Sequence, residues 1–342
     1  MSAGVPEARF IEANGIRMAV YEHGSGTPVV FSHGFPELAY SWRYQLPALA
    51  RAGFRAIAPD QRGYGKTECP EDIESYDIHH LCGDMVGLLD TLRIESAVFC
   101  GHDWGGLVVW QMPLLHPDRV AGVIGVNTPF IPRAPKDPIR IMRSVFGDGM
   151  YIVQFQEQGK AEVVLEKDVE RTFRFFFRKS AISLQEFEKL PPELRSFNFL
   201  EYLEAWDGSG DILCSPEELA VYVKTFKATG FAGGINWYRN MTRNWETTEG
   251  VEQRVEVPSL MISAADDVVL PPSMTEGMEQ YVPDLEKRVI EECGHWTQLD
   301  SSANGAYIFY KFGSNVINLA DRFASREEFA DGYLVVSRIF SS

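Results

Sequence analysis

The sequence predicts an α/β fold in which a mostly parallel sheet is covered by helices on both faces. Short apolar runs alternate with stretches of helical spacing between residues 28 and 126, and again after residue 257. Buried parallel strands and their crossover helices produce this alternation. Between the two regions, about 140–248 is rich in aromatic residues, has helical spacing and contains no strand-like run. The simplest interpretation is one α/β domain with an inserted helical cap.

The first α/β region begins with a hairpin, because residues 7–22 contain two strand-like runs around an Asn-Gly turn. The elements expected after this hairpin are strands at 28–31, 54–59, 97–100 and 120–126, and helices at about 40–51, 76–92 and 104–116. Four prolines between residues 129 and 138 then mark a linker into the cap.

The second α/β region resumes near residue 257, with strands expected at 260–264 and 288–291. After Asp300 one long amphipathic helix would be expected to close the sheet. The sequence instead shows two shorter runs, 306–312 and 316–323. We therefore assign 1–132 and 249–342 to the α/β core and 133–248 to the cap.

Composition excludes several classes of protein. Of 342 residues, 45% are hydrophobic and 23% charged, which is typical of a globular chain that needs no disulfide or metal to hold its core. The formal net charge of −16 disfavours nucleic acid and anionic membranes as partners. No apolar stretch approaches the length of a membrane span, and the start lacks the pattern of a signal peptide. The five cysteines form no CxxC pair, so reduced thiols in a cytoplasmic protein are expected.

The segment 101–106, GHDWGG, has the spacing of a nucleophile elbow. Glycines flank a residue at a tight strand-to-helix turn, where the backbone is strained and passes close to the helix. The central residue is Asp103, whereas esterases have serine there. A carboxylate can displace a leaving group at saturated carbon and form an ester that water then cleaves. The competing structural interpretation is that Asp103 caps the following helix.

Cleavage of such an ester requires a base. Among seven histidines, His295 lies in a loop after a predicted strand, late in the chain, which fits the order nucleophile, acid, histidine. The acid that orients it should come from Asp266 or Asp267, which both follow the strand at 260–264, because Asn127 stands at the end of the earlier strand. Asp267 is our choice.

The segment 33–36, HGFP, follows the first buried strand. It can direct the backbone N–H of Phe35 into the pocket that also receives the N–H of Trp104, and two such donors make an oxyanion hole. A plain turn is the alternative interpretation.

Other motifs fail on inspection. The segment 62–67 ends like a phosphate-binding loop, but Asp60 replaces the required first glycine. The glycines near Asp103 lack dinucleotide-binding spacing, no Gly-x-Ser-x-Gly occurs, and no His/Glu pair has metalloprotease spacing.

Together these motifs resemble those of the epoxide hydrolases of the α/β-hydrolase superfamily, from about residue 8 to Asp300. HGFP at 33–36 resembles their HGxP motif, and GHDWGG at 101–106 their nucleophile motif. The segment 265–271, ADDVVLP, is similar to their acid segment, with the second Asp matching, and 294–298, GHWTQ, to their catalytic-histidine segment. The segment after Asp300 does not resemble the family.

The resemblance implies an α/β-hydrolase fold and adds two cap tyrosines that donate hydrogen bonds to the epoxide oxygen. The segments 151–157 and 236–240 look like those that supply them, which gives these roles to Tyr151 and Tyr238. Each tyrosine alone would more often be a packing residue. Substrate-binding residues expected beside this machinery are His33, Pro36, Phe155 and Trp237.

The resulting hypothesis is an epoxide hydrolase that converts epoxides and water to vicinal diols through an alkyl ester on Asp103. It requires neither a metal nor an organic cofactor, and its partner is a small hydrophobic epoxide. A homodimer is the expected assembly on frequency alone. The alternatives are a haloalkane or haloacid dehalogenase, which would use Trp104 and a second cap Trp or Asn to bind halide, and a non-catalytic receptor for a hydrophobic ligand on the same fold.

Overall fold

The computed structural model describes residues 6–179 and 182–300. Within these ranges one eight-stranded sheet has the order β1-β2-β4-β3-β5-β6-β7-β8. The strands β1 and β2 pair antiparallel with each other, β2 pairs antiparallel with β4, and the remaining pairs are parallel. The strands are β1 (Arg9–Ala13), β2 (Ile16–His23), β3 (Thr27–Ser32), β4 (Phe54–Pro59), β5 (Ala97–His102), β6 (Val120–Val126), β7 (Ser259–Ala264) and β8 (Leu285–Ile290).

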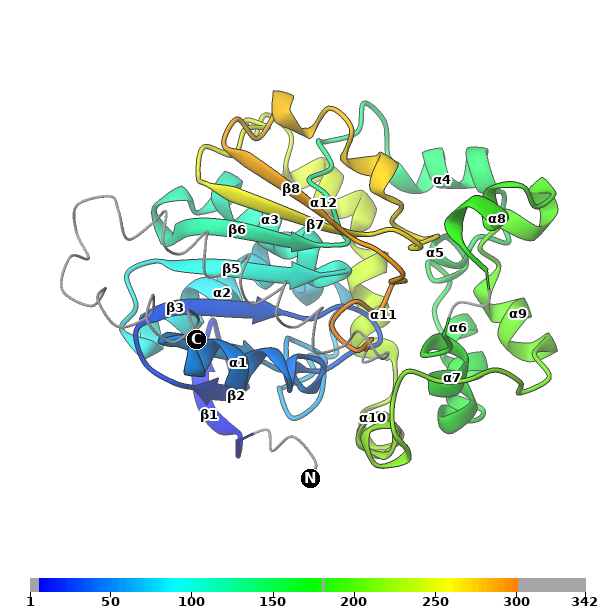
Figure 1. Ribbon diagram of the computed structural model, residues 1–342, viewed down its shortest axis with the longest axis horizontal. Coiled ribbons are helices and arrows are strands. Elements are labelled where there is room, and N and C mark those ends of the chain that lie inside the picture. Colours follow the sequence, from blue (N-terminus) through cyan, green and yellow to red (C-terminus); the bar gives the residue numbers. More distant parts are fainter. Residues whose placement is uncertain (1–5, 180–181, 301–342) are drawn as a thin grey trace, which may run out of the picture.

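Helices cover both faces of this sheet (Figure 1). On one face lies α1 (Gln45–Arg51), and on the other lie α2 (Ile78–Leu92) and α3 (Trp104–Leu115). Alternate residues of β5 enter the two cores: Phe99 packs with the α2–α3 side and Cys100 with the α1 side. Because both faces are covered, β5 is buried along its whole length, and this explains its continuous apolar run.

Between β6 and β7 the described chain is helical, and this segment is called the cap below. Figure 1 shows it stacked at the end of the sheet where the parallel strands terminate. Its helices are α4 (Pro138–Phe146), α5 (Tyr151–Gln154), α6 (Lys160–Glu166), α7 (Val169–Phe176), α8 (Leu184–Glu188), α9 (Phe199–Ala205), α10 (Pro216–Thr229), α11 (Ala232–Arg239) and α12 (Met241–Thr247). Loops that leave the carboxyl ends of parallel strands therefore face the cap.

The seam between core and cap contains buried polar contacts. The guanidinium of Arg43 pairs with Glu218 of α10 at 2.8 Å, and their side chains are only 1% and 14% exposed. Tyr44 also donates to Glu218, and the hydroxyls of Ser41 and Tyr222 lie 2.9 Å apart. These contacts fix α10 to the segment that precedes α1.

The predicted α/β fold is confirmed, with differences at two places. The helical stretch at 40–51 is split into a short 3-10 helix (Ala39–Trp42) and α1, because Pro47 has no N–H for a continuous helix. The strand expected at 288–291 is β8, which begins at Leu285 as a polar edge strand without an apolar signal. The runs 306–312 and 316–323 lie outside the described residues.

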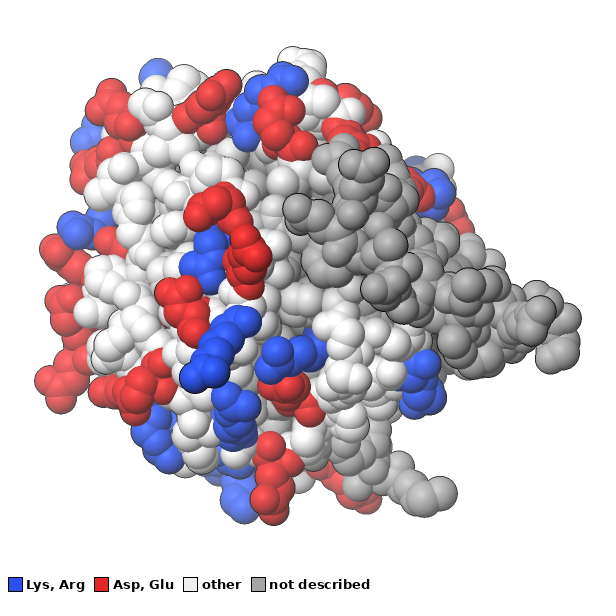
Figure 2. Space-filling model, turned by 90° about the vertical axis from the view of Figure 1, so that its left-hand side faces the viewer, with Lys and Arg blue, Asp and Glu red and all other residues white. Residues whose placement is uncertain are grey.

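Two further features concern the charge of the surface and the apolarity of the helices. Figure 2 shows acidic and basic side chains interspersed on the face remote from the cap, without a continuous basic patch among the described residues. In the part of the chain that the structure describes, no helix has both the length and the apolarity to cross a membrane.

Candidate active site

Asp103 stands at the sharp turn between β5 and α3. Its backbone has φ 52° and ψ −123°, a strained conformation for a non-glycine residue. The turn needs glycine on both sides, since a Cβ on Gly101 would collide with the backbone of Gly105, and one on Gly105 with that of Ser32. The Asp103 side chain makes no capping hydrogen bond to α3, so it is held for another purpose than capping.

Two backbone amides converge on the Asp103 carboxylate. The N–H of Phe35 donates to Oδ1 at 2.8 Å, and the backbone amides of Phe35 and Trp104 both lower the pKa of this carboxyl group. Gly34 permits this approach, because a Cβ there would collide with the Asp103 side chain. The predicted donors Phe35 and Trp104 thus lie at one carboxyl group, as an oxyanion hole requires.

His295 lies between Asp103 and Asp267. Its Nε2 is 3.8 Å from Oδ2 of Asp103, and its Nδ1 is 2.9 Å from Oδ2 of Asp267. Burial alone would lower the pKa of His295, but Asp267 and then Asp103 raise it to about 9. Asp266 turns elsewhere, since its Oδ1 accepts the N–H of Leu184 at 3.2 Å.

The Asp267 carboxylate is fully buried and surrounded by donors. Its Oδ1 accepts the N–H groups of Val269 at 2.9 Å and Leu270 at 3.0 Å. Burial alone would raise the pKa of Asp267, but His295 and these hydrogen bonds lower it to about 2. Asp267 is therefore ionised at neutral pH and fixes Nδ1 of His295 as a donor.

Asn127 supports this acid and was not predicted to do so. It follows β6 with φ 61°, and its amide donates to Oδ2 of Asp267 at 2.6 Å. Its carbonyl oxygen accepts the Thr297 hydroxyl at 2.7 Å, which ties the acid to the histidine loop. The signal in the sequence was a polar residue at the end of a strand. From the sequence, Asn127 was used only to show that this strand ends without a carboxylate.

Burial raises the pKa of the Asp103 carboxyl above its usual value. The nearby imidazoles of His295 and His102 and the two amides oppose that rise. The side chain keeps 13% of its surface exposed, so it remains accessible from the cavity above it.

A cavity of about 750 Å³ lies between core and cap. Asp103 and His295 lie on its wall, together with Tyr151 of α5 and Tyr238 of α11. Further aromatic residues on this wall are Phe35, Phe155, Phe175, Phe176, Phe199, Tyr202 and Trp296. Of these, Phe155 was a predicted substrate-binding residue, whereas Phe176, Phe199 and Trp296 were not singled out, because nothing in their local sequence distinguishes them from core aromatics.

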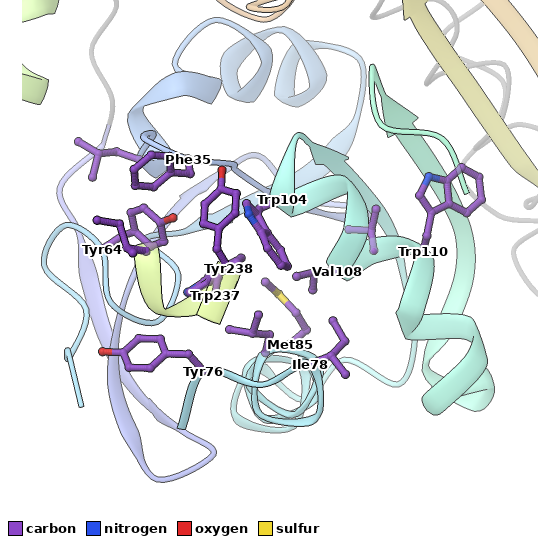
Figure 3. Packing of buried hydrophobic residues seen from close by; sticks show 14 of the residues in the cluster. Phe35, Tyr64, Tyr76, Ile78, Met85, Trp104, Val108, Trp110, Trp237 and Tyr238 are labelled. Carbon is purple, nitrogen blue, oxygen red and sulfur yellow. The ribbon is translucent and has the colours of Figure 1, made fainter. Parts of the chain in front are cut away.

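Aromatic packing positions the two tyrosines. The Tyr151 ring stacks on Phe199 at 4.7 Å, and the Tyr238 ring lies edge-on to Trp104 at 5.1 Å. Figure 3 shows Tyr238 beside Trp104 and Phe35. Burial raises the pKa of both tyrosines far above the usual value, so both remain hydrogen donors at neutral pH. Their ring centroids are 5.8 Å apart and the rings are nearly perpendicular, so the two phenols pack against each other.

Three residues expected to bind substrate do not lie on the cavity wall. His33, Pro36 and Trp237 are buried away from it. The imidazole of His33 hydrogen-bonds to the carbonyl oxygen of Gly34 and to the backbone N–H of Gln61. The indole N–H of Trp237 donates to the carbonyl oxygen of Arg62 at 3.1 Å. Of the four residues expected to bind substrate, Phe155 alone lines the cavity.

In 6–179 and 182–300 no group of three or more His, Cys, Asp or Glu side chains is arranged to hold a metal ion.

Comparison with known proteins shows the family and the fold. The alpha/beta hydrolase fold family matches residues 27–302. Epoxide hydrolase A of Mycobacterium tuberculosis is 45% identical over 86% of this chain and 93% of its own. Bifunctional epoxide hydrolase 2 of Sus scrofa is 44% identical over 84% of this chain, which spans only 52% of that relative's length. The crystal structure of epoxide hydrolase A from Mycobacterium thermoresistibile has a TM-score of 0.81 at 39% identity, covering 92% of this chain and 98% of the other.

Proposed function

Since the chain belongs to the epoxide hydrolase family of the α/β-hydrolase superfamily, we propose that it adds water to epoxides to give vicinal diols. One observation carries the proposal: a carboxylate on an elbow, a histidine–aspartate pair and two tyrosine hydroxyls line a single cavity. The carboxylate suits attack on saturated carbon, and the hydroxyls suit the oxygen that such an attack releases.

In the first step the Asp103 carboxylate attacks one epoxide carbon and the carbon–oxygen bond breaks. The hydroxyls of Tyr151 and Tyr238 hold the epoxide oxygen, and one of them transfers its proton to the alkoxide. The product is a 2-hydroxyalkyl ester on Asp103. Because the phenols are buried and neutral, they are poised to donate rather than to accept.

Ester formation also prepares His295 for the second step. The Asp103 charge is one of the causes that raise the pKa of His295, so its loss on esterification weakens the hold on the imidazolium proton. That proton restores the tyrosine, and the neutral His295 then deprotonates a water, oriented by Asp267. The water attacks the ester carbonyl, and the amides of Phe35 and Trp104 hold the oxyanion. His295 returns the proton to the departing diol, and the Asp103 carboxylic acid then gives its proton to His295, which restores the starting carboxylate and imidazolium.

The cavity fits the two alternative functions, a dehalogenase and a non-catalytic receptor, less well. A dehalogenase needs N–H donors for halide, but the indole N–H of Trp296 is used by the carbonyl of Phe176, and the Trp104 ring packs against Tyr238. A ligand receptor would have no use for the buried Asp267–His295 pair, whose ionised acid costs desolvation.

We also propose the domain bounds, the class of substrate, the location and the assembly of the protein. We propose 1–132 and 249–342 as the core and 133–248 as the cap, because the helices α4 to α12 fall between β6 and β7. The aromatic wall supports a small hydrophobic epoxide as substrate. The five cysteines are free thiols, which supports a reducing, cytoplasmic location. A homodimer rests only on the frequency of such assemblies.

The decisive experiment traps the ester. A His295→Gln variant is mixed with an aryl epoxide, and the intact mass is recorded and then mapped by peptide. We expect an increase equal to the mass of the epoxide, located on Asp103, because the first step proceeds while the second lacks its base. The matched control, Asp103→Asn combined with His295→Gln, should gain no mass. An unlabelled His295→Gln protein, together with a wild type inert to a range of epoxides, would refute the proposal.

A further inference from the structure

The first turn of α11 lies directly against a loop of the core. A Cβ on Gly233 would stand 2.4 Å from the carbonyl oxygen of Gly63, and a Cβ on Gly63 would stand 2.9 Å from the Cα of Gly233. The two backbones therefore touch with no side chain between them. Because glycine disfavours a helix, the two successive glycines at 233–234 indicate that this close contact requires them.

Gly234 extends this contact to the oxyanion hole. A Cβ on Gly234 would stand 2.5 Å from the hydroxyl oxygen of Tyr64 and 2.7 Å from a ring carbon of Phe35. Phe35 supplies the backbone N–H that donates to Oδ1 of Asp103 at 2.8 Å. The start of α11 therefore packs against a residue that helps to hold the nucleophile.

One turn further along α11, Trp237 joins the helix to the same loop. Its side chain is fully buried, and its indole N–H donates to the carbonyl oxygen of Arg62 at 3.1 Å. Its ring lies edge-on to the rings of Tyr64 at 5.4 Å and Trp104 at 5.8 Å. Figure 3 shows Trp237 and the adjacent Tyr238 beside Trp104.

The end of α11 is also bonded to the core. Asn240 follows this helix and is buried, and its side-chain amide donates to the carbonyl oxygen of Ile73 at 2.6 Å. Ile73 begins a short 3-10 helix (Ile73–Tyr76) that precedes α2. Core residues thus hold α11 at its first turn, at Trp237 and at its end.

Tyr151 has a different support. Its ring packs against those of Phe155 at 5.4 Å and Phe199 at 4.7 Å, and its backbone N–H donates to the carbonyl oxygen of Phe197 at 3.1 Å. All three partners belong to the cap. The Tyr238 ring also contacts Phe155, at 5.0 Å, but the helix that carries Tyr238 is bonded to the core. The two tyrosines therefore have different anchors.

We propose that α11 is docked on the core and that Trp237 is a positioning residue, which holds the Tyr238 hydroxyl in place relative to Asp103 independently of the part of the cap that carries Tyr151. Trp237 does not line the cavity, so it acts on the reaction through its neighbours. The proposal rests on the proposed function, because it assigns Trp237 to ester formation through Tyr238.

Single-turnover mixing with an aryl epoxide tests this role. Trp237→Phe keeps an aromatic ring and removes the indole N–H. We expect ester formation to slow by about 10-fold, which is part of the loss of about 10²-fold expected for a missing donor to the developing alkoxide. Ester breakdown should remain unchanged. Trp245→Phe is the matched control, because this indole N–H donates instead to the carbonyl oxygen of Ala134 at 2.8 Å, and it should slow neither step.

A double-mutant cycle shows whether Trp237 acts through Tyr238. In the Tyr238→Phe background, Trp237→Phe should cause no further slowing of ester formation, because the hydroxyl that it positions is already missing. In the Tyr151→Phe background the full loss of about 10-fold should remain. Equal further losses in both backgrounds, or slower ester breakdown in Trp237→Phe, would overturn the proposal, because a merely structural defect is not confined to one donor or one step.

Hydrogen exchange measured by mass spectrometry tests the docking without a substrate. In Trp237→Phe, backbone exchange in 232–240 should become faster, whereas exchange in α9, which carries Phe199, should not change. Exchange that rises equally in both segments, or in neither, would overturn the proposal. A wild type that forms no ester with a range of epoxides would instead refute the proposed function, and the exchange result would still decide how α11 is held.

Discussion

The core and the cap contribute to the cavity in different ways. The core supplies Asp103, Asp267 and His295 from turns that follow strands, and backbone hydrogen bonds and close glycine contacts fix these turns. The cap supplies Tyr151 from a four-residue helix and Tyr238 from α11, both held by aromatic packing. This difference shows that residues positioned by backbone geometry can be recognised by a sequence motif. Residues positioned by side-chain packing have almost no such motif.

The largest effect is expected from the core. Asp103→Asn removes the charged nucleophile at nearly constant shape, and kcat should fall by about 10⁴-fold. Steady-state hydrolysis of an aryl epoxide measures this. Asp266→Asn is the matched control, because Asp266 faces Leu184 rather than His295, and it should retain most activity. Equal losses in the two variants would contradict the assignment of the nucleophile.

A smaller effect, restricted to one step, is expected from the cap. Tyr151→Phe and Tyr238→Phe should each slow ester formation by about 10²-fold, as the loss of one donor to a developing oxyanion does. Breakdown of the ester should be unchanged, because the core alone performs it. Single-turnover mixing separates the two rates. Tyr202→Phe, whose hydroxyl pairs with Ser196, is the control and should not slow ester formation. Slower ester breakdown in Tyr151→Phe or Tyr238→Phe would contradict the proposal that the cap tyrosines act only in ester formation.

The smallest effect concerns the seam that joins the two regions. Arg43→Met leaves Glu218 buried without its partner and should lower the free energy of unfolding by about 3 kcal/mol. Arg143→Met breaks the exposed pair with Asp148 instead, whose side chains are 52% and 86% exposed, and should change it by less than about 0.5 kcal/mol. Urea unfolding measures both. Equal changes in the free energy of unfolding in the two variants would show that the Arg43–Glu218 pair does not stabilise the attachment of the cap.

Prediction from sequence succeeded where one local constraint determines the structure. The elbow requires Gly101 and Gly105 whatever surrounds it, so its pattern could be recognised directly. Prediction was less successful where distant segments meet. His33, Pro36 and Trp237 looked like wall residues by their position beside motifs, yet they are not among the residues that line the cavity. Neighbours in sequence need not share a face, because a turn directs consecutive side chains in different directions.

The sequence by itself determined the α/β class, the strand ends that carry Asp103, Asp267 and His295, and the helical nature of the cap, because apolar periodicity and glycine-dependent turns are local properties. Only the tertiary structure decided which aromatics line the cavity, that Asn127 supports the acid, and that α11 lies against the core loop of Arg62 and Gly63. The physical reason is that burial and hydrogen bonding depend on what arrives from elsewhere in the chain. Gly63 and Gly233 acquire their contact only when two distant segments of the chain meet.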